Sequence, residues 1–162
     1  MSETLPIRKT HSVFDEVRDV QNRIMERAYE IFRGTGGALG RDLENWLSAE
    51  RELVWKPSIE LREKDHEFSL EVAAPGVEAK DIDIEVTPEH ILVKAQTSHE
   101  HKEEKGDVHT CEFEAGSMFR AIHLPKRINP EKVKAQFKDG LLTLTAEIAE
   151  EAGAKKVTVD AA

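Results

Sequence analysis

Between Trp55 and Ile148 the sequence consists of short segments in which apolar and polar residues alternate. This period of two is typical of β-strands with one buried face, because successive side chains point to opposite sides of a strand. We expect the following apolar sets to face inward: Ile59 and Leu61; Phe68, Leu70 and Val72; Ile82, Ile84 and Val86; Ile91, Val93 and Ala95; Met118, Ile122 and Leu124; Val133, Ala135 and Phe137; and Leu142, Leu144 and Ala146. About seven or eight such strands, with no helical segment between them, predict a mainly β fold, an antiparallel β-sandwich of the immunoglobulin type.

Residues that favour turns separate these segments. Three of the separators are Lys64-Asp65-His66, Ala74-Pro75-Gly76 and Thr87-Pro88-Glu89. Asp139-Gly140 joins the last two segments, and an Asp-Gly loop of this kind is typical of a β-hairpin.

The N-terminal third of the chain has a helical period instead. From Ser12 to Phe32 the apolar residues recur at spacings of three, four and seven: Val13, Val17, Val20, Ile24, Ala28 and Ile31. We expect Ser12 to cap this helix and Gly34 to end it. A second helix should begin with Asp42 as its cap and run to about Leu53, with an apolar side made of Leu43, Trp46, Leu47 and Leu53. The two helices, joined by a Gly-rich turn, form a predicted hairpin.

The chain therefore divides into a helical arm (residues 1–54), a sandwich domain (55–148) and a C-terminal extension (149–162). The first part of the extension is small and polar, typical of a flexible tether. It carries Val157-Thr158-Val159, and in an extended chain both valines point to the same side.

Charge and composition exclude several partners. The 162 residues include 32 acidic and 23 basic side chains, a net charge of -9, which disfavours binding to nucleic acid or to an anionic membrane. No apolar stretch approaches the roughly 20 residues that span a bilayer, and the N-terminus lacks the layout of a secretory signal. We expect a soluble, cytoplasmic protein, and Cys111, the only cysteine, is compatible with a reducing compartment.

No motif for catalysis is recognisable. The Gly-rich run from Gly34 to Asp42 lacks the Lys followed by Ser or Thr of a phosphate loop, so we expect no nucleotide. His99, His101 and His109 are the best metal candidates, but a solvated charged loop explains them better than a zinc site. We therefore expect no metal, no cofactor and no enzyme; a metal-dependent hydrolase using His99 and His101 is the distant alternative.

Four groups of residues occur in an order that resembles the small heat shock protein (alpha-crystallin) family: Trp55-Lys56-Pro57, Ala74-Pro75-Gly76-Val77, Leu124-Pro125 and the run from Ala135 to Leu142. The resemblance covers about Trp55 to Val159. Residues 27–53 also resemble a small bacterial domain of unknown function, which implies no activity. Three departures from the larger family are Met118 in place of Phe, Cys111 near a usual Arg, and Val-x-Val in place of Ile-x-Ile. Valine is one methylene smaller than isoleucine, so each valine of the C-terminal extension should dock on a neighbouring subunit more weakly, by up to about 0.8 kcal/mol per site.

The family resemblance implies an ATP-independent holdase of the stress response, which binds partly unfolded client proteins and limits their aggregation. It also implies dimers that exchange a strand carried on a long excursion, here Thr97 to Thr110. We expect this excursion to reach the partner's first strand, so that the dimer interface includes Ser58, Glu60, Arg62, His99 and His101. Arg120 shares its parity with Met118 and Ile122, and we expect it to form an ion pair at the dimer interface or the sandwich edge.

Oligomers would be built from these dimers by the tail. The resemblance implies that Val157 and Val159 enter a groove of a neighbouring dimer lined by Ile82, Ile84, Val86, Val133, Ala135 and Phe137. Because each contact is small, subunits should exchange readily.

Candidates for client binding are the apolar residues of the helices: Phe14, Val17, Ile24, Ile31, Phe32 and Trp46. Packing between the two helices explains the same residues equally well. The rival function is a non-enzymatic interaction scaffold or co-chaperone-like module for a dedicated folded partner.

Overall fold

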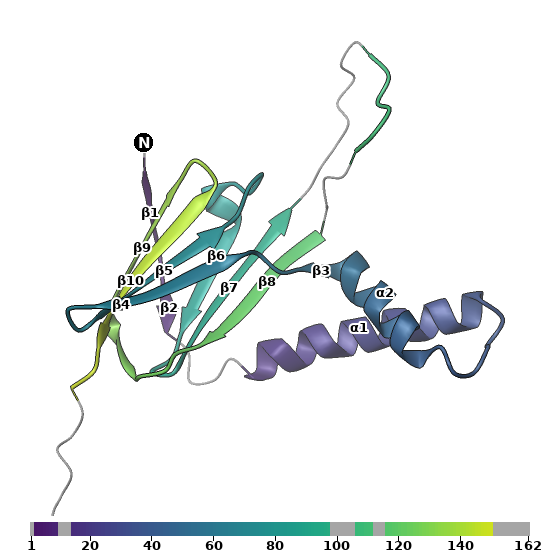
Figure 1. The fold of residues 1–162 in the computed structure, drawn as a ribbon, viewed down its shortest axis with the longest axis horizontal. Helices are drawn as coiled ribbons and strands as arrows, with labels where there is room; N and C mark the ends of the chain where they lie inside the picture. Colours follow the sequence, from purple (N-terminus) through teal and green to yellow (C-terminus); the bar gives the residue numbers. More distant parts are fainter. Residues whose placement is uncertain (1, 10–13, 98–105, 112–115, 151–162) are drawn as a thin grey trace, which may run out of the picture.

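The computed structural model describes residues 2–9, 14–97, 106–111 and 116–150, and its main body is a sandwich of two five-stranded sheets (Figure 1). The first sheet has the order β1 (Glu3–Leu5), β9 (Ile128–Lys138), β10 (Leu141–Ile148), β5 (Glu67–Ala73) and β4 (Ile59–Lys64). The second has the order β2 (Arg8–Lys9), β6 (Ile82–Val86), β7 (His90–Thr97), β8 (Gly116–His123) and β3 (Val54–Trp55). A 3₁₀ turn, η1 (Ala79–Asp81), leads into β6. The predicted sandwich is confirmed.

The core of the sandwich is formed by the residues that alternate in the sequence. All the predicted inward sets belong to or pack against one cluster, in which Phe68, Ile84 and Leu144 are at most 1% exposed. Ile59, Leu61 and Val133 are half-buried, because β4 and the first part of β9 lie nearer the margins of their sheet. Alternation of apolar and polar residues therefore located the buried face of each strand.

Two tight hairpins depend on left-handed backbone conformations. Asp139 and Gly140 have φ values of 50° and 79° in the β9–β10 turn, which confirms the predicted hairpin. Asp65 and His66 have φ values of 52° and 63° in the β4–β5 turn, where no glycine is present. Non-glycine residues adopt this conformation at a steric cost, so the β4–β5 turn is the more strained of the two.

The helical arm consists of α1 (Phe14–Gly34) and α2 (Asp42–Leu53), and both predicted helices are confirmed. Figure 1 shows this hairpin projecting from one end of the sandwich, next to β3 and β8. Ser12, the predicted cap of α1, and Val13 lie outside the described residues. Neither helix of the described chain combines the length and apolar character needed to cross a membrane.

The predicted start of α2 is wrong by one residue. Arg41 is the N-cap, without a side-chain capping bond, and its carbonyl accepts the amide of Asn45 at 2.9 Å. Asp42 is instead the first helical residue, where its charge is favourable because the first turn of a helix carries a partial positive charge.

The predicted apolar side of α2 is also partly wrong. Leu43 and Leu47 are 71% and 41% exposed, whereas Asn45 and Ala49 are buried. Ala49 packs with Val20 and Ile24 of α1 in a second, smaller core, which also includes Trp46, Leu53, Val54 and Phe119. A small residue at the closest approach lets the helices pack tightly, and this turns the two leucines outward.

The first residues of the chain, grouped above with the helical arm, are strands of the sandwich. β1 pairs antiparallel with β9, and β2 pairs parallel with β6. β3 also pairs parallel, with β8. The second sheet is therefore mixed, whereas the sequence predicted antiparallel strands throughout. Both parallel strands are short and adjoin the helical arm in the sequence, so their direction follows from where the arm leaves and re-enters the sandwich.

Candidate functional site

Strands β6 and β9 lie one strand in from the ends of their sheets, and the short strands β2 and β1 pair with their outer edges. Consecutive strands β1 and β2 pair with β9 and β6, and only Pro6 and Ile7 separate them, so the two edges must be close. The six residues predicted to line a groove meet here and are buried or half-buried in the main core: Ile82, Ile84, Val86, Val133, Ala135 and Phe137. We call this edge the β6–β9 groove.

In the structure the β6–β9 groove is occupied by the chain's own N-terminal segment, Glu3–Lys9. Leu5 is 8% exposed and Ile7 is half-buried, and both pack against the main core. Leu5 is opposite Ala135 on β9, and Arg8 is opposite Glu85 on β6. The segment therefore joins the two sheets at their common edge. Sequence reasoning missed it, although Leu5-Pro6-Ile7 has two apolar residues at strand spacing.

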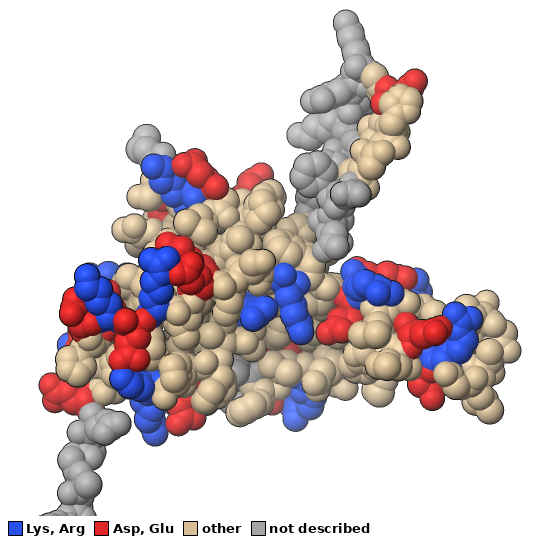
Figure 2. Space-filling view, in the orientation of Figure 1, with Lys and Arg blue, Asp and Glu red and all other residues tan. Residues whose placement is uncertain are grey.

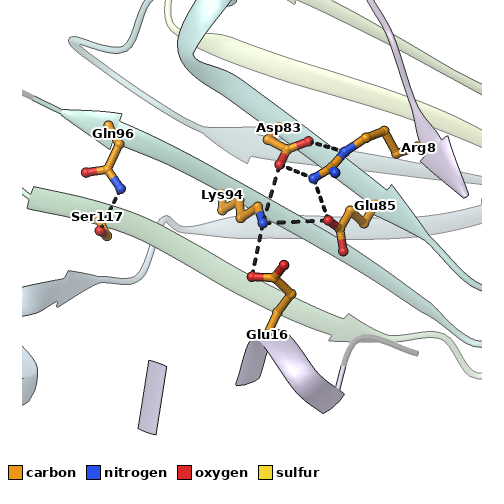
Figure 3. Close-up of polar contacts among 7 residues, drawn as sticks. All are labelled: Arg8, Glu16, Asp83, Glu85, Lys94, Gln96 and Ser117. Atoms are coloured by element: carbon orange, nitrogen blue, oxygen red, sulfur yellow. Dashed lines mark hydrogen bonds and ion pairs between the residues drawn. The ribbon is translucent and has the colours of Figure 1, made fainter. Parts of the chain in front are cut away.

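A cluster of charged residues holds this segment on the outer side of β6; we call Arg8, Glu16, Asp83, Glu85 and Lys94 the ionic cluster (Figure 3). The Nε of Arg8 donates to Asp83 Oδ1 at 2.9 Å, and its Nη2 contacts Asp83 Oδ2 and lies 2.5 Å from Glu85 Oε1. The Nζ of Lys94 lies 3.0 Å from Glu16, 3.4 Å from Asp83 and 3.6 Å from Glu85. The cluster thus connects β2, β6, β7 and α1.

Burial and charge shift the pKa of both cations. The hydrogen bond to Asp83 raises the pKa of Arg8 above its ordinary value; burial acts in the opposite direction, and the charges of Asp83, Glu85 and Glu16 add to the rise. For Lys94, burial alone lowers the pKa, but the hydrogen bond to Glu16 and the charges of Glu16, Glu85 and Asp83 together raise it. Both side chains therefore stay charged, and they neutralise Glu85, whose side chain is only 7% exposed. Asp83 on β6 and Lys94 on β7 are directly opposite each other, and this pair of opposite charges was the feature of the sequence that could have predicted the ionic cluster.

A second open edge lies at β4. Among the described strands β4 pairs only with β5, and the predicted interface residues Ser58, Glu60 and Arg62 are exposed along it. Glu60 and Arg62 form an ion pair with each other. Charged side chains are typical of an edge protected against indiscriminate pairing. His99 and His101, predicted at the same interface, lie outside the described residues.

Arg120 lies elsewhere. It is half-buried on β8, in the other sheet, at a hollow that Trp46 and Ile24 of the helical arm also line. Within the described ranges it forms no ion pair. The structure therefore does not bring Arg120 to the β4 edge.

The helical arm exposes apolar side chains. Phe14 is 67% exposed, and Val17, Ile31, Phe32 and Trp46 are half-buried. Ile24 is only 4% exposed, so it belongs to the core of the arm and is not accessible.

Sequence reasoning missed several more exposed side chains of the arm: Met25, Tyr29, Leu39, Leu43 and Leu47. Met25, Tyr29 and Phe32 follow one face of α1, and the rings of Tyr29 and Phe32 stack with centroids 6.2 Å apart. In the sequence these residues form a second apolar stripe on α1, beside the stripe that packs on α2, and this second stripe could have predicted the exposed surface. Figure 2 shows uncharged surface at the loop end of the hairpin.

The described residues offer little for catalysis. They contain no group of three or more His, Cys, Asp or Glu placed to hold a metal ion. Cys111 and His109 are exposed, and the rings of His90 and His123 contact each other, with a nitrogen–nitrogen distance of 3.2 Å.

The fold and the β4 edge define the class of the molecule: an immunoglobulin-like β-sandwich with an exposed sheet edge at β4 and a helical arm that exposes apolar side chains. Residues 60–160 match the Hsp20/alpha crystallin family, and the chain belongs to that family. Residues 19–54 match a second family, described as a protein of unknown function (DUF2934). Both resemblances inferred from the sequence are confirmed.

Known proteins agree with this assignment. The chain is 34% identical to small heat shock protein C2 of Rickettsia felis over 112 residues, 69% of this chain and 71% of that protein. It is 32% identical to spore protein SP21 of Stigmatella aurantiaca, over 64% of this chain and 61% of that protein. Among solved structures, heat shock protein 16.0 from Schizosaccharomyces pombe has 27% identity and a TM-score of 0.55, covering 66% of this chain and 99% of that one. A small heat-shock protein from Xylella fastidiosa, with 20% identity and a TM-score of 0.53, shares the fold.

Proposed function

We propose that the protein is an ATP-independent chaperone of the holdase type, which binds partly unfolded proteins and prevents their aggregation. The observation that carries this function is the apolar surface of the helical arm, where Met25, Tyr29 and Leu43 are 56%, 60% and 71% exposed. Large side chains of this kind gain free energy when they cover the apolar surface of an unfolding protein. Binding lowers the concentration of free sticky chains by mass action, so no chemical step is needed.

Assembly regulates how much of this surface is available. The open edge of β4, with Ser58, Glu60 and Arg62, is suited to accept a strand from a second subunit, and the excursion of residues 97–110 is the candidate donor. The β6–β9 groove is suited to accept the tail with Val157 and Val159, which would link dimers into exchangeable oligomers. Arg120, beside the arm, is expected to find its ion-pair partner in the assembled protein.

Light scattering tests the chaperone function. The wild-type chain should suppress aggregation of a heat-labile client, and Met25→Ser with Leu43→Ser should weaken that suppression several-fold without changing the unfolding transition, because both side chains are exposed. The matched control is Gln21→Ser with Asn22→Ser, two exposed polar positions on α1, which should change nothing. A wild-type chain that leaves client aggregation unchanged would reject the holdase and favour a scaffold for a dedicated folded partner.

A further inference from the structure

We infer that the N-terminal segment Glu3–Lys9 is a built-in competitor of the tail for the β6–β9 groove, and that its release loosens the helical arm. The inference rests on the proposed function only in assigning the tail to this groove. It names a regulator that the proposed function does not contain.

The N-terminal segment and the tail have the same apolar pattern. Leu5 and Ile7 are separated by one residue, as are Val157 and Val159. Leu5 and Ile7 pack against the same main core to which Ile84 contributes. All four are branched apolar side chains, and in an extended chain this spacing directs both members of a pair to the same side. The groove therefore accepts the same pattern from either end of the polypeptide.

The N-terminal segment and the tail cannot occupy the groove at the same time. Glu3, Thr4 and Leu5 take the outer edge of β9, and Arg8 and Lys9 take the outer edge of β6. A strand edge offers one row of free amide and carbonyl groups, so a second extended segment cannot pair with it while the first is present. Docking of the tail requires the N-terminal segment to leave.

The segment is held weakly enough to be displaced, because its ion pairs are screened by water: the side chains of Arg8 and Lys9 are 59% and 50% exposed. Of its residues only Leu5 is buried and Ile7 half-buried, while Glu3, Thr4, Pro6, Arg8 and Lys9 are exposed. Its paired strands are three and two residues long. The gain from burying one and a half side chains is partly offset by the entropy lost on ordering the chain.

The ionic cluster connects this displacement to the helical arm. While Arg8 is bound, Arg8 and Lys94 together face the carboxylates of Asp83, Glu85 and Glu16 (Figure 3). When Arg8 leaves, Lys94 alone faces all three. Glu16, in the first turn of α1, then competes with two fixed carboxylates on β6 for one cation, so the start of α1 is held less firmly. Only residues 10–13 separate β2 from α1, so release of the segment also removes a covalent restraint on the start of the helix.

A disulfide lock tests the competition in the full-length chain. Thr4 and Gln136 are directly opposite in the β1–β9 pair, so Thr4→Cys with Gln136→Cys, in a Cys111→Ser background, should form a bond on oxidation. The oxidised protein, after incubation that permits subunit exchange, should have the smaller mass of a Val157→Ser, Val159→Ser variant, and reduction should restore the larger mass. The same cysteines with Val157→Ser and Val159→Ser should not respond to oxidation.

The outcomes separate this inference from the proposed function. If the two valine substitutions leave the mass unchanged, the tail does not link dimers and that part of the proposed function fails. If they reduce the mass but the oxidised lock does not, the tail docks without competition and the inference alone is overturned. If the two thiols stay free in a folded protein, the N-terminal segment does not lie on β9 and the inference is again overturned.

A second set of variants tests the same competition without a disulfide. Leu5→Ser with Ile7→Ser should lower the concentration at which oligomers dissociate by about fivefold or more, because the groove is open in a larger fraction of subunits. The control is Thr4→Ser, an exposed position of the same segment, which should leave that concentration unchanged. An unchanged concentration for the double variant would contradict the inference.

The link to the arm has its own measurement. Arg8→Gln should increase amide hydrogen exchange several-fold in the first turns of α1, around Glu16 and Val17. Lys132→Gln, which removes the ion pair with Glu147 away from the cluster, should not. Equal exchange in the two variants would show that the segment and the arm are independent.

Discussion

At the scale of single residues, Glu85 has the most demanding environment. It is the one charged residue that is buried among those the structure describes, and its carboxylate depends on Arg8 and Lys94 for neutralisation. Arg8 is 59% exposed, whereas Lys94 is only 27% exposed. Lys94 is therefore the less screened of the two partners, and its loss should cost more than the loss of an ordinary surface cation.

Lys94→Met should lower the free energy of unfolding by about 1–3 kcal/mol, because it removes charge from beside a buried carboxylate. Urea unfolding at neutral pH measures the change. Lys126→Met is the matched control, since the Lys126–Glu63 pair is exposed and should contribute less than about 1 kcal/mol. Equal losses in the two variants would contradict the importance of the cluster.

The loss of stability caused by Lys94→Met should depend on pH in a predictable way. The pKa of Lys94 is raised in the folded protein above its ordinary value of 10.5. A cation with a raised pKa contributes its full stability below the unfolded-state pKa and loses it as pH rises through the folded-state pKa. The difference in unfolding free energy between wild type and Lys94→Met should therefore be constant at neutral and mildly alkaline pH. It should shrink only above about pH 10.5, the unfolded-state value.

At the scale of elements, the hairpins show how closely local sequence and geometry agree. The β9–β10 turn has Gly140 at a φ of 79°, and a Cβ there would lie 3.4 Å from the Cα of Pro75. Glycine satisfies both constraints. The β4–β5 turn has Asp65 and His66 in the same left-handed region without that freedom.

Asp65→Asn with His66→Gly should therefore stabilise the protein by about 1 kcal/mol, because Asn-Gly favours a turn with two positive φ values. Thermal or urea unfolding measures the gain. Asp139→Asn is the control, since that turn already has its glycine, and it should change stability little. A loss of stability in the double variant would mean that His66 contributes contacts larger than its backbone strain.

The β4 edge provides the second prediction at this scale. Deletion of residues 99–107 should convert the proposed dimer to a monomer, since β4 would lose the strand proposed to pair with it. Light scattering coupled to size-exclusion chromatography measures the mass, and an unchanged unfolding transition would show that the sandwich still folds. A stable dimer after the deletion would exclude strand exchange through this excursion.

At the scale of the whole molecule, the sites proposed for assembly and the surface proposed for client binding lie on different parts. The helical arm projects from one end of the sandwich (Figure 1). The β4 edge and the β6–β9 groove belong to the sandwich, whereas the exposed apolar side chains of Tyr29 and Leu43 belong to the arm. Phe119 of β8 packs in the core of the arm, so the two parts are in contact. A change at the sheet can therefore alter the exposure of the arm.

A chain that ends at Glu151 lacks both valines of the tail, and it should form smaller particles than the full chain while remaining dimeric. Native mass measurement of the two proteins side by side makes the comparison. Val157→Ser with Val159→Ser in the full-length chain should have the same effect, which separates the valines from the rest of the extension. Identical masses for all three proteins would discard the tail as a link between dimers.

Much of the fold could be predicted because its signals are local. Phe68, Leu70 and Val72 alternate with polar residues, and each is at most 1% exposed, since the period of a strand alone assigns them to one face. The helix of Val20 and Ile24 follows from its own period in the same way. The exposure of the side of α2 that carries Leu43 could not be predicted in this way. Which stripe of a short helix is buried depends on the neighbour against which the helix packs.

The β6–β9 groove shows the same division. That the groove binds the tail stays a prediction. The burial of its lining residues Ile84 and Ala135 was predicted, because both belong to strands whose period is clear. Its occupant was not, because β1 and β2 are too short to show a period, and their pairing partners Ala135 and Glu85 are far along the chain.

By itself, then, the order of amino acids determined the two-layer β architecture, the helical hairpin and the family, since each of these depends on periodicity and turns within short stretches. Only the tertiary structure decided that Leu5 and Ile7 fill the β6–β9 groove, that Glu85 is buried between Arg8 and Lys94, and that Leu43 faces outward. The physical reason is that these features arise from contacts between distant segments, whose free energy depends on which surfaces meet once the local elements have formed.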